Sequence, residues 1–162
     1  MKTFREDNKA YERWLRRQCK VVQKDLDRKH KRMKDKPAFV FLRATYFRWA
    51  HRIEAICPEL ANAPSVLAVG DIHLENYGTW RDADGRWIWG VNDFDEAARM
   101  PYAFDLVRLV TSIQLAPGMK IAHGAIASAV LQGYREGLAD PGPVLLDRPG
   151  NSWIRPYVNC SD

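Results

Sequence analysis

The amino-acid sequence predicts an α+β fold in which helices pack around one short β-hairpin that carries two acidic loops. Its 162 residues are 46% hydrophobic and 28% charged, enough for one compact domain with a core, and too apolar for a chain that is disordered throughout. Apolar residues recur at helical spacing toward both ends, whereas an Asp-Gly turn separates two tryptophan-rich runs in the middle. No apolar run is long enough for a membrane helix, so no membrane contact is expected.

Residues 1–36 are expected to form one basic amphipathic helix. Between Arg5 and Lys34 apolar side chains recur at steps of three or four, as one face of a helix requires, and Pro37 then ends the helix. The segment holds fourteen Lys or Arg against six Asp or Glu. A solvated helix face accounts for these charges, and a surface for nucleic acid or phosphorylated ligands is the alternative. We favour the solvated face because no aromatic side chains interleave with the charges.

Residues 37–139 are expected to form the core of the domain. Within it, residues 39–56 begin with a short apolar run that predicts a strand or extended segment, and then pass into helical spacing. A turn-rich connection leads to SVLAVG, residues 65–70, whose β-forming residues predict a buried strand. This strand stops at the polar, glycine-bracketed stretch GDIHLENYG, residues 70–78.

A hairpin and two helices complete the expected core. In residues 79–97 the Asp84-Gly85 turn lies between tryptophan-rich runs, a strong signal for a hairpin, and the second arm leads into NDFDE. Helical spacing predicts helices over residues 103–116 and about 120–139. Residues 140–162 contain clustered Pro and Gly without periodicity, so a linker or a truncated C-terminal end is expected there.

Two acidic loops, residues 70–78 and 92–96, follow predicted strands and are joined by the hairpin, which would hold them side by side. Oxygen-rich clusters of this kind suit a hard cation such as Mg²⁺. A single acidic loop is more often a solvated turn, but two loops attached to one hairpin favour a site. The loops offer Asp71, His73, Glu75, Asn76, Asp93, Asp95 and Glu96.

The order of these residues resembles two groups of proteins. Asp71 followed five residues later by Asn76, then a hairpin, then Asp93-Phe94-Asp95 resembles the catalytic and metal-binding motifs of protein kinases and of aminoglycoside and choline kinases. More closely, GDIHLENYG, NDFDEA and FDLVRLVTS together resemble the bacterial family catalogued as domain of unknown function 2252. That resemblance covers roughly residues 36–135, and three motifs in the same order make it specific.

The resemblance implies a protein-kinase-like C-lobe fragment and phosphoryl transfer from ATP to an unidentified hydroxyl acceptor. In the implied reaction Asp71 orients or deprotonates the acceptor, and Asn76 and Asp93 bind a Mg²⁺ ion that bridges the phosphates of the nucleotide. Asp95 lies two residues beyond Asp93, so that on a strand both would face the same side, which makes Asp95 a candidate second metal ligand.

Further residues are expected to support the two acidic loops or to contact the substrate. We expect Asp105, on the helix after the second loop, to accept hydrogen bonds from the loop backbone, and Arg108, one turn later, to be the ion-pair neighbour of Asp105. Arg43 matches an arginine of the resembled family and is a candidate phosphate or substrate contact. Kinases usually have a histidine where Val69 stands here, so the bracing role in catalysis either passes to His73 or is absent.

The sequence departs from the resembled kinases in its nucleotide-binding elements. It contains no glycine-rich phosphate loop and no lysine in a V-A-x-K context. In the resembled family, Gly is preferred where Ala44 stands. We therefore expect ATP-dependent phosphotransfer from a complete protein, of which this chain is a fragment or a shortened relative, and do not expect the chain alone to grip the nucleotide.

Two other functions remain open. A metal-dependent phosphohydrolase would use His73 together with Asp71, Asp93 and Asp95, without a nucleotide. A catalytically inactive kinase-like binding module, or a nucleic-acid binder that uses the basic helix, would retain the fold without turnover.

A cytoplasmic location is expected because the N-terminus MKTFREDNKAYERW turns polar where a signal peptide would be apolar. The odd, dispersed cysteines Cys19, Cys57 and Cys160 support neither a disulfide framework nor a zinc site. Reduced thiols agree with that location.

Overall fold

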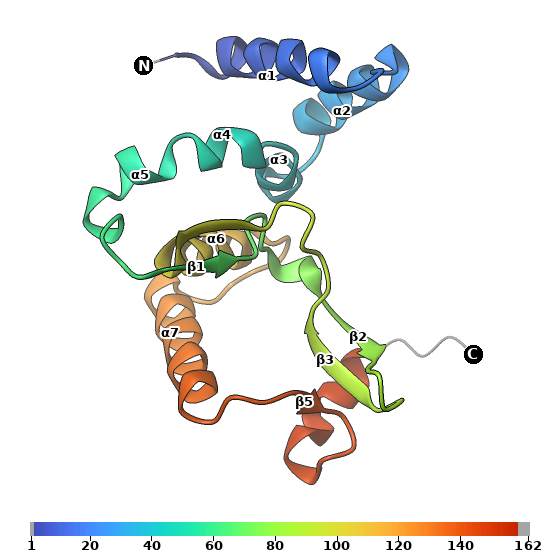
Figure 1. Cartoon of the computed structure of the whole chain (residues 1–162), viewed down its shortest axis with the longest axis vertical. Helices are drawn as coiled ribbons and strands as arrows, with labels where there is room; N and C mark the ends of the chain where they lie inside the picture. The colour runs from blue at the N-terminus through green and yellow to red at the C-terminus, as the bar shows by residue number, and fades with distance from the viewer. Residues whose placement is uncertain (1, 159–162) are drawn as a thin grey trace.

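A computed structural model of the chain describes residues 2–158 and has a mixed α+β architecture. Figure 1 shows the N-terminal helices at one end, the C-terminal segment at the other, and the strands between them. The helices α1 (Phe4–Gln18) and α2 (Gln23–Asp35) form the N-terminal layer. They lie beside the short helices α3 (Ala38–Ala44), α4 (Tyr46–Ala50) and α5 (Ile53–Ile56). No helix among the described residues is both long and apolar enough to cross a membrane.

The prediction of one continuous N-terminal helix is wrong, because the chain turns between Gln18 and Gln23. Thr3 caps α1 through a reciprocal hydrogen-bond pair with Glu6, and Leu26 of α2 is buried. The turn brings His30 of α2 within 2.5 Å of the Glu12 carboxylate on α1. One straight helix would extend away from the core, whereas the turn folds α2 back against α1 and buries Leu26. Cys160 lies outside the described residues.

The expected strand or extended segment after Pro37 is also wrong, since α3 begins directly after this proline. Pro37 precedes the first helical residue, a position where its missing N–H costs nothing. Phe39 of α3 is buried and its ring lies edge-on to the His73 imidazole. The apolar run is therefore one face of a packed helix, and tertiary packing overrides the β propensity of its aromatic and β-branched residues.

The strands form two small antiparallel sheets. Strand β1 (Ser65–Ala68) pairs with β4 (Ala98–Pro101), from Ser65 opposite Pro101 to Ala68 opposite Ala98. Strands β2 (Tyr77–Arg81) and β3 (Trp87–Val91) form the predicted hairpin, and β3 also pairs with β5 (Val144–Leu145). Strand β1 was predicted as buried, but only Ala68 of it is buried, and Leu67 is 81% exposed. Ser65, Val66 and Leu67 are all exposed, so most of this strand lies at the surface and not in the core.

Two longer helices and a short helical segment complete the chain. The predicted helices correspond to α6 (Tyr102–Leu115) and α7 (His123–Ala139), which pack together with the rings of Tyr102 and Tyr134 stacked at 5.4 Å. No regular structure was expected after residue 140, yet β5 and the 3-10 helix η3 (Pro149–Tyr157) lie there. Ile154 in η3 is only 1% exposed, so this segment belongs to the packed fold.

Most of the buried polar side chains among the described residues lie next to the first acidic loop, and Asn8 of α1 is the exception. Alongside apolar core residues such as Phe39 and Phe104, the structure buries Thr45, His73, Asn76, Arg108 and Ser112. Buried polar side chains are costly unless they are hydrogen-bonded, so their concentration at one place marks a functional or organising centre.

Candidate functional site

The two acidic loops run side by side because of the way the strands pair. The first loop joins β1 to β2 and the second joins β3 to β4, while β1 pairs with β4 and β2 pairs with β3. At the hairpin end, the Asn92 N–H donates to the carbonyl of Asn76 at 3.0 Å. At the other end, a β-carbon at position 70 would lie 2.2 Å from the Glu96 carbonyl oxygen, which requires Gly70 to lack a side chain. The loops therefore touch at both ends.

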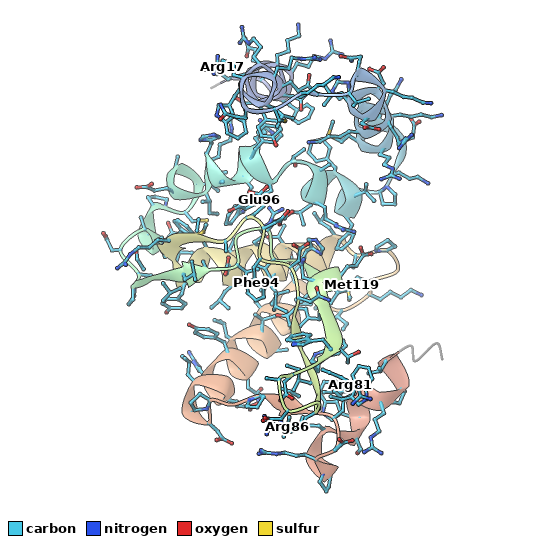
Figure 2. The ribbon with its side chains drawn as sticks, turned by 45° about the vertical axis from the view of Figure 1, so that its right-hand side comes forward. Arg17, Arg81, Arg86, Phe94, Glu96 and Met119 are labelled. Atoms are coloured by element: carbon cyan, nitrogen blue, oxygen red, sulfur yellow. The ribbon has the colours of Figure 1, made fainter. Side chains whose placement is uncertain are left out.

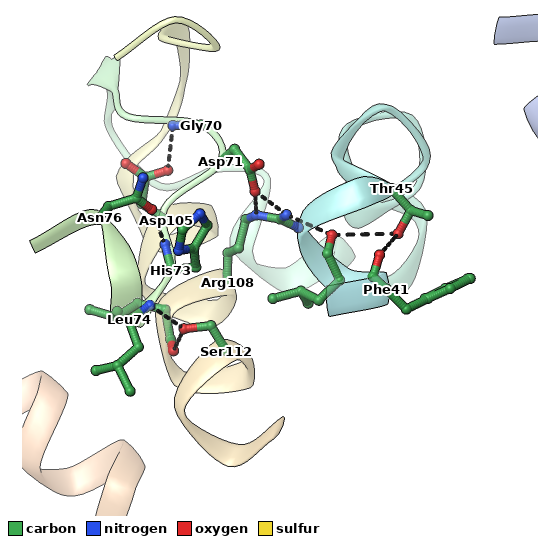
Figure 3. A network of polar contacts seen from close by, with 12 residues as sticks. Phe41, Thr45, Gly70, Asp71, His73, Leu74, Asn76, Asp105, Arg108 and Ser112 are labelled. Atoms are coloured by element: carbon green, nitrogen blue, oxygen red, sulfur yellow. Dashed lines mark hydrogen bonds and ion pairs between the residues drawn. The ribbon is translucent and has the colours of Figure 1, made fainter. Parts of the chain in front are cut away.

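Asp105 of α6 fixes the start of the first loop. Its carboxylate accepts the N–H groups of Val69, at 2.7 Å, and Gly70, at 3.1 Å. These are the backbone hydrogen bonds that the sequence led us to expect of Asp105. Burial raises the pKa of Asp105, and the two N–H donors oppose that rise. Figure 3 shows this contact beside the rest of the polar network.

The first loop also holds itself in a rigid turn. The Asn76 Oδ1 accepts the His73 N–H at 2.6 Å, and the Asn76 N–H donates to the His73 carbonyl at 2.9 Å. The Leu74 N–H donates to the hydroxyl of Ser112 on α6 at 3.0 Å. His73 and Asn76 are each 3% exposed. Their positions are thus set by the local turn η2 (Leu74–Asn76) and by α6 beneath it.

The imidazole of His73 is a neutral group in this setting. Burial lowers its pKa to about 4, with further lowering from the cations Arg43 and Arg108, while the charge of Asp93 acts in the opposite direction. Its Nδ1 is buried and has no hydrogen-bond partner among the described residues. A neutral, enclosed imidazole can brace a loop or exchange a hydrogen bond, but it carries no positive charge at neutral pH.

Asp71 forms an ion pair with Arg108, which is 0% exposed. The Arg108 Nε donates to the Asp71 Oδ1 at 2.8 Å, and the Nη2 donates to the same oxygen and to the Leu42 carbonyl, the latter at 3.1 Å. We had expected Arg108 to pair with Asp105. Asp105 instead binds the backbone just before Asp71, and Arg108, one helical turn further on α6, reaches the side chain of Asp71. Burial raises the pKa of Asp71, and Arg108 partly offsets this.

The carboxylates of the second loop are exposed. Asp93, Asp95 and Glu96 all face solvent, and Figure 2 shows Glu96 at the end of this loop nearest to α4. Burial raises the pKa of Glu96, and the neighbouring charge of Asp95 raises it further. The structure brings Asp71, His73, Asn76, Asp105 and Arg108 into one network, with Asp93 in electrostatic reach of His73. Asp95 makes no hydrogen bond to that network among the described residues, and its charge acts on the neighbouring Glu96, whose pKa it raises.

The donor atoms fit a cation that takes most of its ligands from elsewhere. Within residues 2–158 no three His, Cys, Asp or Glu side chains gather closely enough to hold a metal ion. Mg²⁺ commonly takes one or two protein oxygens and completes its shell with water and substrate phosphates. Of the expected ligands, Asp93 is exposed and offers such an oxygen, whereas Asn76 is 3% exposed and its Oδ1 already accepts the His73 N–H.

Arg43 of α3 lies beside the first loop. It forms an ion pair with Glu75, and its charge lowers the pKa values of both Asp71 and His73. Both partners of this pair are about half exposed. A surface pair of this kind is weak, so an incoming anion could compete with Glu75 for the guanidinium.

A cleft of about 950 Å³ opens on the far side of Gly70, between α1 and α4 to α5. Its walls include the aromatic side chains Tyr11, Trp14 and Phe47, and Tyr46 and Glu96 also line it. The Tyr46 hydroxyl and the Glu96 carbonyl are also the atoms nearest to where a β-carbon of Gly70 would lie. The cleft and the surroundings of Gly70 therefore share two residues, Tyr46 and Glu96.

Sequence reasoning missed several members of this site. Tyr46 and Trp49 flank the Arg108 guanidinium, with its carbon 5.0 and 5.1 Å from the two ring centroids. Ser112 was overlooked as a polar residue within an apolar helix face, although a serine among VTSI residues is the signal that could have identified it. Tyr46 and Trp49 had no such signal, because aromatic residues at helical spacing look like ordinary core.

Comparison with known proteins gives one finding. Residues 20–141, more than half of the chain, match the bacterial family described as "Uncharacterized protein conserved in bacteria (DUF2252)". The comparisons with curated proteins and with solved structures give no match. The matched range includes both acidic loops, the hairpin, α6 and α7, but leaves out α1. The loops and their support on α6 thus lie within the matched range, and this chain belongs to the bacterial DUF2252 family.

Proposed function

We propose that this chain supplies the acceptor-activating and metal-binding part of a kinase-like phosphotransferase site. The observation that carries the proposal is the side-by-side placement of the two acidic loops, with Asp71 anchored in one and Asp93 in the other. Helix α6 supports the site twice: Asp105 binds the loop backbone and Arg108 binds the Asp71 side chain. This support gives the site the rigidity that phosphoryl transfer needs. On this proposal the α+β core corresponds to a kinase-like C-lobe fragment.

In the proposed reaction each residue has a distinct role. Asp71 accepts the proton of the hydroxyl acceptor as its oxygen bonds to the γ-phosphorus of ATP and ADP leaves. Burial raises the pKa of Asp71, which brings its basicity closer to that task. Asn76 and Asp93 would hold Mg²⁺, which supplies charge neutralisation on the transferring phosphoryl group. His73 and Asp105 keep the first loop in place.

The acceptor is proposed to enter through the cleft between α1 and α4 to α5. This cleft has aromatic and polar walls and adjoins Gly70, the residue before Asp71. Clefts of this size with a few convergent polar groups are typical binding sites for small molecules. The nucleotide-gripping elements that kinases place on a glycine-rich loop are absent from the sequence, so the proposal covers one half of a complete phosphotransferase site.

A binding experiment with one substitution tests the proposal. In the full-length protein, Asp93→Ala is expected to weaken Mg²⁺-dependent ATP binding, measured by titration calorimetry, by about tenfold or more, because a contact to a charged group is worth roughly 1.5–3 kcal/mol. Asp84→Ala is the matched control, since Asp84 is an exposed carboxylate in the hairpin turn, at the end where Figure 2 shows Arg81 and Arg86. Equal ATP affinity in wild type and Asp93→Ala would contradict the proposal.

The alternatives draw less support from the geometry. A phosphohydrolase would need His73 and several carboxylates around one metal ion, and the described residues hold no such group of three. An inactive binding module, or a nucleic-acid surface on α1 and α2, would show DNA or RNA binding with a steep salt dependence and no Mg²⁺-dependent ATP binding.

A further inference from the structure

Arg108 stands out as the most completely enclosed charge in the described part of the chain. It is 0% exposed, and its guanidinium lies over the rings of Tyr46 and Trp49, which stack on each other with centroids 5.7 Å apart. The ring faces compensate part of the desolvation of the cation. A buried arginine is costly, so this arrangement indicates a purpose beyond packing.

Arg108 donates hydrogen bonds to only one of the two carboxylate oxygens of Asp71. Both Nε and Nη2 reach Oδ1, and Nη2 is also tied to the Leu42 carbonyl. No described donor reaches Oδ2, and Figure 3 shows this second oxygen turned away from the guanidinium. The Asp71 side chain is 22% exposed while that of Arg108 is fully covered. Arg108 is thus buried within the ion pair, whereas the Oδ2 side of Asp71 is accessible.

We propose that Arg108 is a positioning residue for Asp71: by holding Oδ1 it aims Oδ2 at the acceptor hydroxyl and keeps the carboxyl ionised. This inference rests on the proposed function. The ionisation part has a physical basis, because burial alone favours the neutral carboxyl and an adjacent cation favours the charged form. Arg43 and Glu96 also act on Asp71, the first lowering its pKa and the second raising it, but neither shares a hydrogen bond with it.

The test measures the protonation of Asp71 without relying on turnover. In full-length protein labelled with carbon-13 at aspartate, the Asp71 carboxyl signal is assigned with Asp71→Asn and titrated by NMR. Arg108→Met is expected to raise the pKa of Asp71 by about 1 pH unit or more. Arg86→Met, which removes an exposed arginine at the hairpin tip, is the control and should leave that pKa unchanged. An unchanged Asp71 pKa in folded Arg108→Met overturns the proposal.

A second variant keeps the test decisive if Arg108→Met does not fold. Arg108→Lys retains the charge but loses the two-pronged grip on Oδ1. It should fold, shift the Asp71 pKa by less than about 1 pH unit, and lower kcat for phosphoryl transfer by the full-length protein by about tenfold or more with little change in KM. Wild-type kcat together with a wild-type Asp71 pKa in Arg108→Lys overturns the proposal. Absence of Mg²⁺-dependent ATP binding in the full-length wild-type protein counts against the phosphotransferase function, whereas the NMR result concerns Arg108 alone.

Discussion

Single residues of the first loop explain why the two acidic loops can lie so close together. Gly70 has a φ of +86°, a conformation that L side chains rarely adopt, and Glu96 and Tyr46 fill the space where a side chain would be. Gly85, in the hairpin turn, has a similar φ of +77° but open space around it. A side chain at either position would suffer backbone strain, but only at position 70 would it also collide with the second loop. Comparing substitutions at the two positions therefore distinguishes the two energetic costs.

Replacing Gly70 should harm the site more than replacing Gly85. Gly85→Ala is expected to cost about 1 kcal/mol in the free energy of unfolding, the usual cost of a left-handed alanine. Gly70→Ala carries that cost and a clash with backbone, so a loss of more than about 2 kcal/mol is expected. Urea unfolding of both variants measures the difference. Equal losses would show that the second loop does not press against Gly70.

Among the secondary-structure elements, α1 depends on a small number of charged contacts for its position. Asp7 of α1 accepts hydrogen bonds from Arg48, at 2.9 Å, and from Arg52, at 2.6 and 3.2 Å. The rings of Tyr11 and Phe47 stack beside them at 4.2 Å. Because α1 forms one wall of the cleft, these contacts help to hold that wall in place.

The Asp7 contacts give α1 a predictable sensitivity to substitution and to pH. Asp7→Asn should speed amide exchange across residues 4–18, measured by mass spectrometry. Asp25→Asn, at an exposed pair with Arg28, is the control and should not change exchange there. Arg48 and Arg52 lower the pKa of Asp7, so its stabilising effect is present above the unfolded pKa near 3.8 and is lost as the pH falls through the lower folded pKa. Wild-type exchange in Asp7→Asn would show that aromatic packing alone docks the helix.

At the scale of the whole molecule, the C-terminal segment packs against the hairpin. Strand β5 pairs with β3, the Leu146 N–H donates to the Trp87 carbonyl at 3.0 Å, and Ile154 is buried. The hairpin that joins the two acidic loops is thereby supported on its outer edge. Residues far from the site in sequence thus contribute to the stability of the strands that carry it.

The packing of η3 can be tested with two neighbouring side chains. Ile154→Ala should lower the free energy of unfolding by about 2–4 kcal/mol, because it leaves a cavity at a buried position. Trp153→Ala removes a larger side chain that is 64% exposed, and should change stability by less than about 0.5 kcal/mol. Chemical denaturation followed by circular dichroism compares the two. Similar effects would mean that η3 does not take part in the cooperative fold.

Local patterns in the sequence predicted those features that neighbouring residues decide. The hairpin was predicted from Asp84-Gly85; its turn runs from Asp82 to Gly85, where the Gly85 N–H donates to the Asp82 carbonyl at 3.0 Å and Gly85 takes the left-handed φ of +77°. Helical spacing located α6 and α7, and the motif order identified the family. Predictions from short apolar runs were wrong where tertiary packing decides. Residues 39–44 form a helix instead of a strand, because an apolar run of this length does not distinguish a helix from a strand.

The sequence by itself determined the α+β class, the hairpin, the later helices and the chemical character of the two acidic loops. Only the tertiary structure decided that Arg108 binds Asp71 instead of Asp105, that the N-terminal helix breaks in two, and that β1 pairs with β4 to bring the loops together. The physical reason is the range of the interactions. Turn geometry and helical periodicity act over a few residues, whereas buried charges and strand partners are chosen by contacts between segments about 30 or more residues apart.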